Sequence, residues 1–216
     1  MEFIDSIETK ELSLLYISQF LPKDPIIVES GAHIGRNTIK MKNFWPESII
    51  YAFEPAKYIY QQLIKNTQNY KNIFCYNIAL SEKIGTQEMY ISYGQSTAVS
   101  SLYEPISNLS KDIIFKIENV ESETFASWAN KNNIKKVDFF WLDMQGAELL
   151  LLKYAKFLLK NTYSIFIEVN LIERYKNIPL YFEVINFLEK ENFIAIAKSS
   201  IKNNKINILF INKNIV

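Results

Sequence analysis

The stretch of residues 26–38 constrains the fold of this chain more than any other part of the sequence. It begins with a short apolar run at 26–28, continues through a turn that contains Gly31 and Gly35, and ends in the polar start of a helix. An uninterrupted apolar run is typical of a strand buried on both faces, as in a parallel sheet. Glycine lets the backbone turn sharply and approach a ligand closely. The stretch therefore predicts a strand, a ligand-binding loop and a helix in succession.

The rest of the chain alternates between apolar runs and helical patterns. Strands are predicted at 49–54, 72–77, 136–143 and 163–169, and helices at 36–43, 55–66, 123–133, 147–159 and 179–190. The runs at 193–197 and 206–211 predict a terminal antiparallel hairpin. Strand–helix–strand steps of this length favour right-handed crossovers and a parallel sheet. We therefore predict one α/β domain over residues 1–216, with a mostly parallel sheet.

Two regions lie outside this alternation. Residues 1–22 have a broad apolar face and end at Pro22, which predicts a helix. The segment 1–24 could cover the sheet, act as a lid or form a dimer contact. Further along, strands at 87–92 and 112–121 flank the polar, irregular segment 93–111. A loop of that length in a compact domain is more often functional than a plain connection.

Composition and charge exclude several classes of protein. Apolar residues make up 49% of the chain and charged residues 22%, the balance of a folded globular protein. A net charge of +1 gives no overall attraction to nucleic acid. No basic, apolar leader begins the chain, and no apolar run approaches the ~20 residues that span a bilayer. A single cysteine, Cys75, fits a reducing compartment, so we expect a cytoplasmic protein.

Polar residues end the five predicted parallel strands. They are Glu29, Glu54, Asn77, Asp143 and Glu168. In open α/β sheets the ligand lies outside the carboxyl ends of the strands, where the strand order reverses. Because acidic side chains are rarely buried unless they are paired, a shared rim of carboxylates predicts a binding site there.

The loop after the first strand does not fit a phosphate-bearing ligand. The dinucleotide pattern Gly-x-Gly-x-x-Gly would need glycines where this chain has His33 and Arg36, and no Gly-Lys-Ser/Thr pattern follows. Glu29 beside the loop would also repel a pyrophosphate. Glu54 lies near the ~20-residue spacing at which an acidic residue binds ribose hydroxyls. An adenosine with a cationic tail free of phosphate satisfies both conditions, and S-adenosylmethionine is such a molecule.

The motifs of this chain resemble those of a known family. The segment 29–35 is similar to the first motif of class I S-adenosylmethionine-dependent methyltransferases, an acidic residue followed by Gly-x-x-x-Gly. Further segments resemble the FkbM-like methyltransferases: GAHIGRNT at 31–38, YAFEP at 51–55, NIALS at 77–81, SSL at 100–102 and VDFFWLDMQGAE at 137–148. The resemblance covers about residues 26–170. One departure is Gln145, since the family usually has Asp-x-Glu-Gly where this chain has Asp143-Met144-Gln145-Gly146.

The resemblance implies a Rossmann-like fold with a seven-stranded sheet, an antiparallel C-terminal hairpin and helices on both faces. It also implies S-adenosylmethionine as cofactor. The loop would wrap the methionine part with Glu29 near its ammonium group, Glu54 would hold the ribose hydroxyls, and Asn77 and Ala79 would flank the adenine. The full set implied for the cofactor is Glu29, Ser30, Gly31, Ala32, His33, Gly35, Asn37, Thr38, Glu54, Pro55, Asn77, Ala79, Asp143 and Gln145.

Three side chains are candidates for the base that removes a proton from a hydroxyl acceptor: Asp143, His33 and Glu168. His33 is the single histidine and has a suitable pKa, although it could instead cap the helix or contact the cofactor. Asp143, Glu168 and Asn170 could alternatively hold a divalent cation, but two carboxylates make a thin case and we expect no metal. For the acceptor we predict contacts from Ser100, Ser101, Asn170, Arg174 and Tyr175.

The sequence thus predicts a methyltransferase that acts on a hydroxyl of a small molecule, such as a sugar or glycan precursor. An N-methyltransferase and a catalytically silent scaffold that binds S-adenosylmethionine or a nucleoside remain alternatives, and a dehydrogenase is disfavoured by His33 and Arg36. We expect no nucleic-acid partner, and a homodimer is possible.

Overall fold

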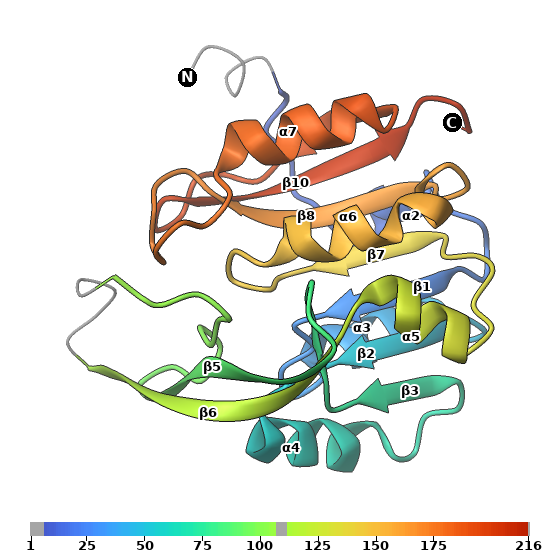
Figure 1. The fold of residues 1–216 in the computed structure, drawn as a ribbon. Coiled ribbons are helices and arrows are strands. Elements are labelled where there is room, and N and C mark those ends of the chain that lie inside the picture. The colour runs from blue at the N-terminus through green and yellow to red at the C-terminus, as the bar shows by residue number, and fades with distance from the viewer. Residues whose placement is uncertain (1–6, 107–111, 216) are drawn as a thin grey trace.

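A mostly parallel sheet forms the centre of the molecule (Figure 1). The computed structural model describes residues 7–106 and 112–215. Within these ranges the main sheet has seven strands in the order β3-β2-β1-β7-β8-β10-β9. The strands are β1 (Ile26–Ser30), β2 (Ile49–Phe53), β3 (Ile73–Tyr76), β7 (Phe139–Leu142), β8 (Ser164–Asn170), β9 (Phe193–Lys198) and β10 (Lys205–Asn212).

The pairing of these strands confirms the predicted topology. Strands β3, β2, β1, β7 and β8 pair in parallel, whereas β10 pairs antiparallel to both β8 and β9. The order along the sheet reverses beside β1, because β2 lies on one side of it and β7 on the other. A ligand site is expected at the carboxyl ends of these three strands.

Helices cover both faces of the sheet, as predicted. They are α2 (Leu14–Ser18), α3 (Arg36–Phe44), α4 (Lys57–Thr67), α5 (Phe125–Lys131), α6 (Glu148–Leu159) and α7 (Tyr181–Lys190). Side chains alternate between the faces of a strand. Val28 and Phe140 therefore pack with α5, α6 and α7, whereas Ile27 and Phe139 pack with α2 and α3 on the opposite face.

A second, smaller sheet stands beside the carboxyl ends of β1, β2 and β3 (Figure 1). It contains β4 (Ala79–Leu80), β5 (Gly85–Gly94) and β6 (Ile113–Glu123), in the order β4-β6-β5. The strands predicted at 87–92 and 112–121 are thus confirmed, and they form a long antiparallel ribbon. After β5 the chain folds back on it, since the backbones of Tyr90 and Ser101 hydrogen-bond to each other. Part of the predicted loop 93–111, residues 107–111, lies outside the described residues.

The predicted N-terminal helix at 1–22 is wrong over most of its described length. Only residues 14–18 are helical, with the Ser13 hydroxyl accepting a hydrogen bond from the Tyr16 N–H at 3.2 Å. Before them the chain is extended and pairs with the end of β9, where the Lys198 N–H donates to the Glu8 carbonyl at 2.9 Å. A sheet edge far along the chain thus offers this segment backbone partners that override its helical pattern. Residues 1–6 lie outside the described part.

No helix in the described ranges has both the length and the apolar character needed to cross a membrane.

Candidate active site

One cavity opens at the carboxyl ends of β1, β2 and β7, at the point where the strand order reverses. Many residues selected from the sequence line it: Ser30, Gly31, Ala32, His33, Asn37, Glu54, Pro55, Ala79, Ser100, Asp143 and Gln145. The wall also contains residues that sequence reasoning missed: Arg36, Ile78, Leu80, Met89, Thr97, Ala98, Leu102, Met144 and Ala147. Most of the missed residues are small or apolar, so their side chains carry no chemical signal of a site.

The loop after β1 is held tightly against its neighbouring strands. The N–H groups of Gly31 and Ala32 both donate to the Phe53 carbonyl, at 3.1 and 3.0 Å. Gly31 has a φ of 88°, and a Cβ atom placed there would lie 1.9 Å from the Asp143 carbonyl oxygen. The structure therefore requires glycine here because the loop approaches β7 so closely, a reason that differs from the ligand approach expected from the sequence.

Glu54 is buried at the cavity wall with its carboxylate fixed by the backbone. Its two oxygens accept hydrogen bonds from the N–H groups of His33, at 3.0 Å, and Ala56, at 2.9 Å. Burial raises the pKa of Glu54 to about 7. Asn77 does not line the cavity; its side-chain amide donates to the carbonyls of Glu54 and Pro55, both at 2.9 Å, and so shapes the turn that carries the carboxylate.

Glu29 lies beneath the loop and is not among the residues that line the cavity. It shares a strand face with Ile27, so its side chain points toward α3, where the Thr38 hydroxyl donates to it at 2.5 Å. Its other carboxylate oxygen has no hydrogen-bond partner among the residues that the structure describes, and burial raises the pKa of Glu29 to about 8. Thr38 and Gly35 are likewise absent from the wall.

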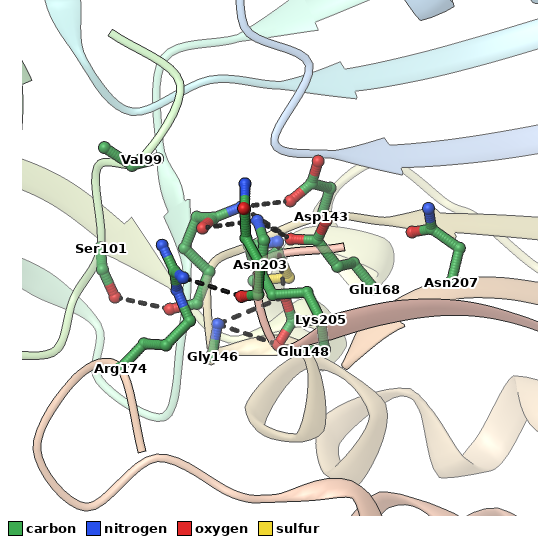
Figure 2. Close-up of polar contacts among 12 residues, drawn as sticks. Val99, Ser101, Asp143, Gly146, Glu148, Glu168, Arg174, Asn203, Lys205 and Asn207 are labelled. Atoms are coloured by element: carbon green, nitrogen blue, oxygen red, sulfur yellow. Dashed lines mark hydrogen bonds and ion pairs between the residues drawn. The ribbon is translucent and has the colours of Figure 1, made fainter. Parts of the chain in front are cut away.

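A polar network at the end of β7 joins residues of the cavity wall to residues outside it (Figure 2). The Gln145 amide nitrogen donates to Asp143 at 2.5 Å and to Glu168 at 3.0 Å. Lys205 forms an ion pair with Glu168 and also donates to the Gln145 oxygen at 3.3 Å. Asp143 lines the cavity, whereas Glu168 and Lys205 do not. Burial, and then the charge of Glu168, raise the pKa of Asp143 to about 8.

Glu148 fixes the turn that follows β7, a role that sequence reasoning missed. Its carboxylate accepts hydrogen bonds from the N–H groups of Met144, at 2.7 Å, and Gly146, at 3.1 Å. Burial raises the pKa of Glu148 to about 7. An acidic residue in the first turn of a helix, as here in α6, was the available signal.

Most of the predicted acceptor residues support the wall and do not line it. Ser101 is buried and donates to the Gln145 carbonyl at 2.8 Å, and the Tyr175 hydroxyl donates to the Val99 carbonyl at 2.8 Å. Arg174 donates to the Asn203 carbonyl at 2.9 Å, and Asn170 is 2% exposed. Of the predicted set, Ser100 lines the cavity. The hydrogen bonds of Ser101 and Tyr175 hold the segment 97–102 in place.

His33 connects the loop after β1 to that overlying segment. Its Nε2 atom lies 2.8 Å from the Thr97 hydroxyl, and both residues line the cavity. Burial, and then the charge of Arg36, lower the pKa of His33. The imidazole is therefore favoured in its neutral form, in which it can hydrogen-bond to Thr97.

A positive charge already lies beside the residues suggested as ligands of a cation. In the described residues no group of three or more histidines, cysteines, aspartates or glutamates is arranged to hold a metal ion. Of the suggested ligands, Glu168 is paired with the Lys205 ammonium group.

A seven-stranded sheet with this order and a cavity at the reversal of strand order give the chain the Rossmann-like fold of class I methyltransferases, and solved structures share this fold. The chain is similar to the FkbM methyltransferase of Methylobacillus flagellatus, with a TM-score of 0.60 and 13% identity over 97% of this chain and 50% of that one. It is also similar to Aeropyrum pernix fibrillarin in complex with natively bound S-adenosyl-L-methionine, with a TM-score of 0.52 and 14% identity over 88% and 69% of the two chains.

The sequence gives the family. Residues 29–195 match the methyltransferase FkbM domain, so the chain belongs to the FkbM methyltransferases and is an enzyme of that class. The chain is 24% identical to the 2-O-methyltransferase NoeI of Sinorhizobium fredii, over 73% of this chain and 68% of NoeI. It is 28% identical to the methyltransferase sdnD of Sordaria araneosa, over 62% of this chain and 61% of sdnD. The match thus spans about two thirds of each relative.

Proposed function

We propose that this enzyme uses S-adenosylmethionine to methylate a hydroxyl group of a small molecule, such as a sugar or glycan precursor. The observation that carries the proposal is a single cavity whose wall contains both the Glu54 carboxylate, at the end of β2, and the Asp143 carboxylate, at the end of β7. One carboxylate suits the cofactor's ribose, and the other suits the acceptor.

The residues of the cavity fit the chemistry of the cofactor. Glu54 presents carboxylate oxygens, which are strong acceptors for a pair of ribose hydroxyls. The wall beside the adenine position would be formed by Ile78, Ala79 and Leu80, which offer apolar contact. Arg36 and Asn37 begin helix α3 at the edge of the cavity, where they would face the carboxylate of the methionine part. Carboxylates in the wall favour a ligand that carries positive charge.

Asp143 supplies the acid–base chemistry in this proposal. When bound, S-adenosylmethionine supplies a methyl group on a positively charged sulfur. A hydroxyl acceptor must lose its proton as it attacks, and Asp143 accepts that proton at its carboxylate. A base works best when its pKa lies near the working pH, which agrees with the raised pKa of Asp143, about 8. The remaining wall residues align the acceptor and exclude water.

Methylation at oxygen is favoured over methylation at nitrogen for two reasons. NoeI, to which this chain is 24% identical, is described as a 2-O-methyltransferase. A neutral amine attacks through a free lone pair, so it needs no base before the methyl transfer. A hydroxyl acceptor does need one, and the wall contains the Asp143 carboxylate.

Calorimetric titration tests the cofactor directly. We expect S-adenosylhomocysteine to bind the protein with one site per chain, and NAD to show no heat of binding. Turnover is then measured with radiolabelled S-adenosylmethionine against a panel of sugars and of amines of matched size. Binding of NAD without S-adenosylhomocysteine would contradict the proposal, and label transferred to amines alone would contradict the choice of oxygen.

A further inference from the structure

Lys205 reaches the active-site network from outside the segment that matches the family. The family match ends at residue 195, and Lys205 is the first residue of β10 in the terminal hairpin. In the antiparallel pairing of β10 with β8 it lies opposite Asn170, two residues along β8 from Glu168. Its side chain and that of Glu168 are each 15% exposed. A largely buried ion pair therefore contacts Gln145 of the cavity wall. Figure 2 shows Lys205 and Glu168 beside Asp143.

Gln145 links this ion pair to Asp143 through hydrogen bonds. Its amide nitrogen donates to the carboxylates of Asp143 and Glu168, and its oxygen accepts from Lys205 and from the Tyr175 hydroxyl, both at 3.3 Å. The reverse orientation of the amide would place its oxygen against two carboxylates, so the contacts fix a single orientation. A glutamate at this position could not donate to Asp143 and Glu168 while both are charged.

We propose that Lys205 is a positioning residue for methyl transfer, whose ammonium group, held against Glu168 and Gln145, shifts the Asp143 carboxyl group toward its proton-accepting form. The proposal rests on the proposed function in one respect, the assignment of Asp143 as the base. Lys205 does not touch the cavity, so it acts through its neighbours.

The charges around Asp143 explain why a cation is needed there. Three acidic side chains interact with Asp143 through like charge: Glu168 on β8, Glu148 on α6 and Glu29 on β1. The Tyr175 hydroxyl also faces Asp143. Burial and these carboxylates favour the protonated acid. Lys205 on β10 opposes them and lowers the pKa of Asp143.

The test measures the titration of Asp143 itself and needs no acceptor. The chain contains five aspartates, so a protein labelled with carbon-13 at the aspartate carboxyl carbons gives few resonances, and Asp143→Asn identifies the one from Asp143. We expect Lys205→Gln to raise the midpoint of that resonance by roughly one pH unit, because an opposite charge nearby lowers the pKa of a carboxyl group by ~1–3 units. Glu168→Gln should move the midpoint to lower pH, and the double variant should return it close to the wild-type value.

The controls separate charge from structure. Lys205→Arg keeps the charge and should leave the midpoint unchanged. Lys202→Gln removes an equal charge from the exposed turn of the same hairpin and should also leave it unchanged. If Lys205→Gln fails to fold, the double variant, which leaves no unpaired charge, is compared with Glu168→Gln. The midpoint of the Asp143 resonance is then expected at higher pH in the double variant than in Glu168→Gln.

Two outcomes have distinct meanings. If Lys205→Gln and Lys202→Gln give the same midpoint in protein that still binds S-adenosylhomocysteine, the role of Lys205 is refuted and the proposed function stands. If the wild-type protein does not bind S-adenosylhomocysteine, the proposed function fails, and with it the purpose assigned to Lys205.

Discussion

Glu29 and Glu54 end neighbouring strands of the sheet, yet their side chains point to different environments. Glu54 lies in the cavity wall, whereas Glu29 points toward α3 and hydrogen-bonds with Thr38. Glu29 lies inside β1, opposite Ala52 of β2, whereas Glu54 follows the last residue of β2. The position of each carboxylate relative to the end of its strand therefore decides whether it meets the cavity or the underside of the loop. At the scale of single residues, the two glutamates are therefore expected to contribute differently to binding.

Replacing Glu54 tests its contact with the cofactor. We expect Glu54→Gln to weaken the binding of S-adenosylhomocysteine by roughly 10- to 100-fold, because a hydrogen bond to a charged group contributes ~1.5–3 kcal/mol. Glu29→Gln is the matched control, and calorimetry should show a smaller loss. Equal losses in the two variants would contradict the assignment of Glu54 to the cofactor.

Replacing Asp143 tests the base. Asp143→Asn keeps the size of the side chain, so the affinity for S-adenosylhomocysteine should stay within a few-fold of the wild type, while turnover falls by ~10²–10⁴-fold, the usual contribution of a general base. Single-turnover rates at saturating cofactor measure the loss of turnover. Lost binding with intact turnover per bound enzyme would show that Asp143 serves the cofactor instead.

At the scale of elements, the loop after β1 depends on its contact with β7. The predicted strand, loop and helix at 26–43 are confirmed by β1 and α3, because their apolar and glycine pattern is strong and local. The contact between Gly31 and the Asp143 carbonyl joins residues 112 positions apart in the sequence, and no local pattern shows it.

Gly31→Ala should destabilise the protein by about 2–4 kcal/mol, since the new Cβ meets backbone atoms and φ is positive. Gly85→Ala is a control with a φ of 114° and, in the described part of the chain, no atom within 4 Å of the added Cβ, so its cost should be limited to about 1 kcal/mol of backbone strain. Urea unfolding gives both free energies. A cost for Gly31→Ala no larger than that for Gly85→Ala would contradict the steric explanation.

For the whole molecule, four buried carboxyl groups around the cavity make stability depend on pH. Burial raises the pKa of Glu29 and Asp143 to about 8 and that of Glu54 and Glu148 to about 7, well above their ordinary values. Between the ordinary pKa of these carboxyl groups and the raised values, the folded protein holds more protons than the unfolded chain. The free energy of unfolding therefore falls as the pH rises through this range. His33, whose pKa is lowered, acts in the opposite sense with a single proton.

The melting temperature of the ligand-free protein should therefore fall as the pH is raised from about 5 to about 8. Scanning calorimetry in buffers of constant ionic strength measures this slope. Glu29→Gln should flatten it, because this substitution removes one of the titrating groups while leaving the cavity wall intact. A melting temperature that rises over the same interval would contradict the assigned directions.

The sequence by itself determined the order of the strands and helices, the class of the fold and the family, because buried parallel strands, helix faces and glycine turns are local patterns. It also selected Glu54 and Asp143, since a polar residue at the end of an apolar strand is visible in one dimension. Only the tertiary structure decided that residues 8–10 pair with Lys198 at the end of β9, that Glu29 faces away from the cavity, and that Lys205 stands behind Asp143. Each of these depends on contacts between distant segments, and such contacts exist only once the sheet has brought those segments together.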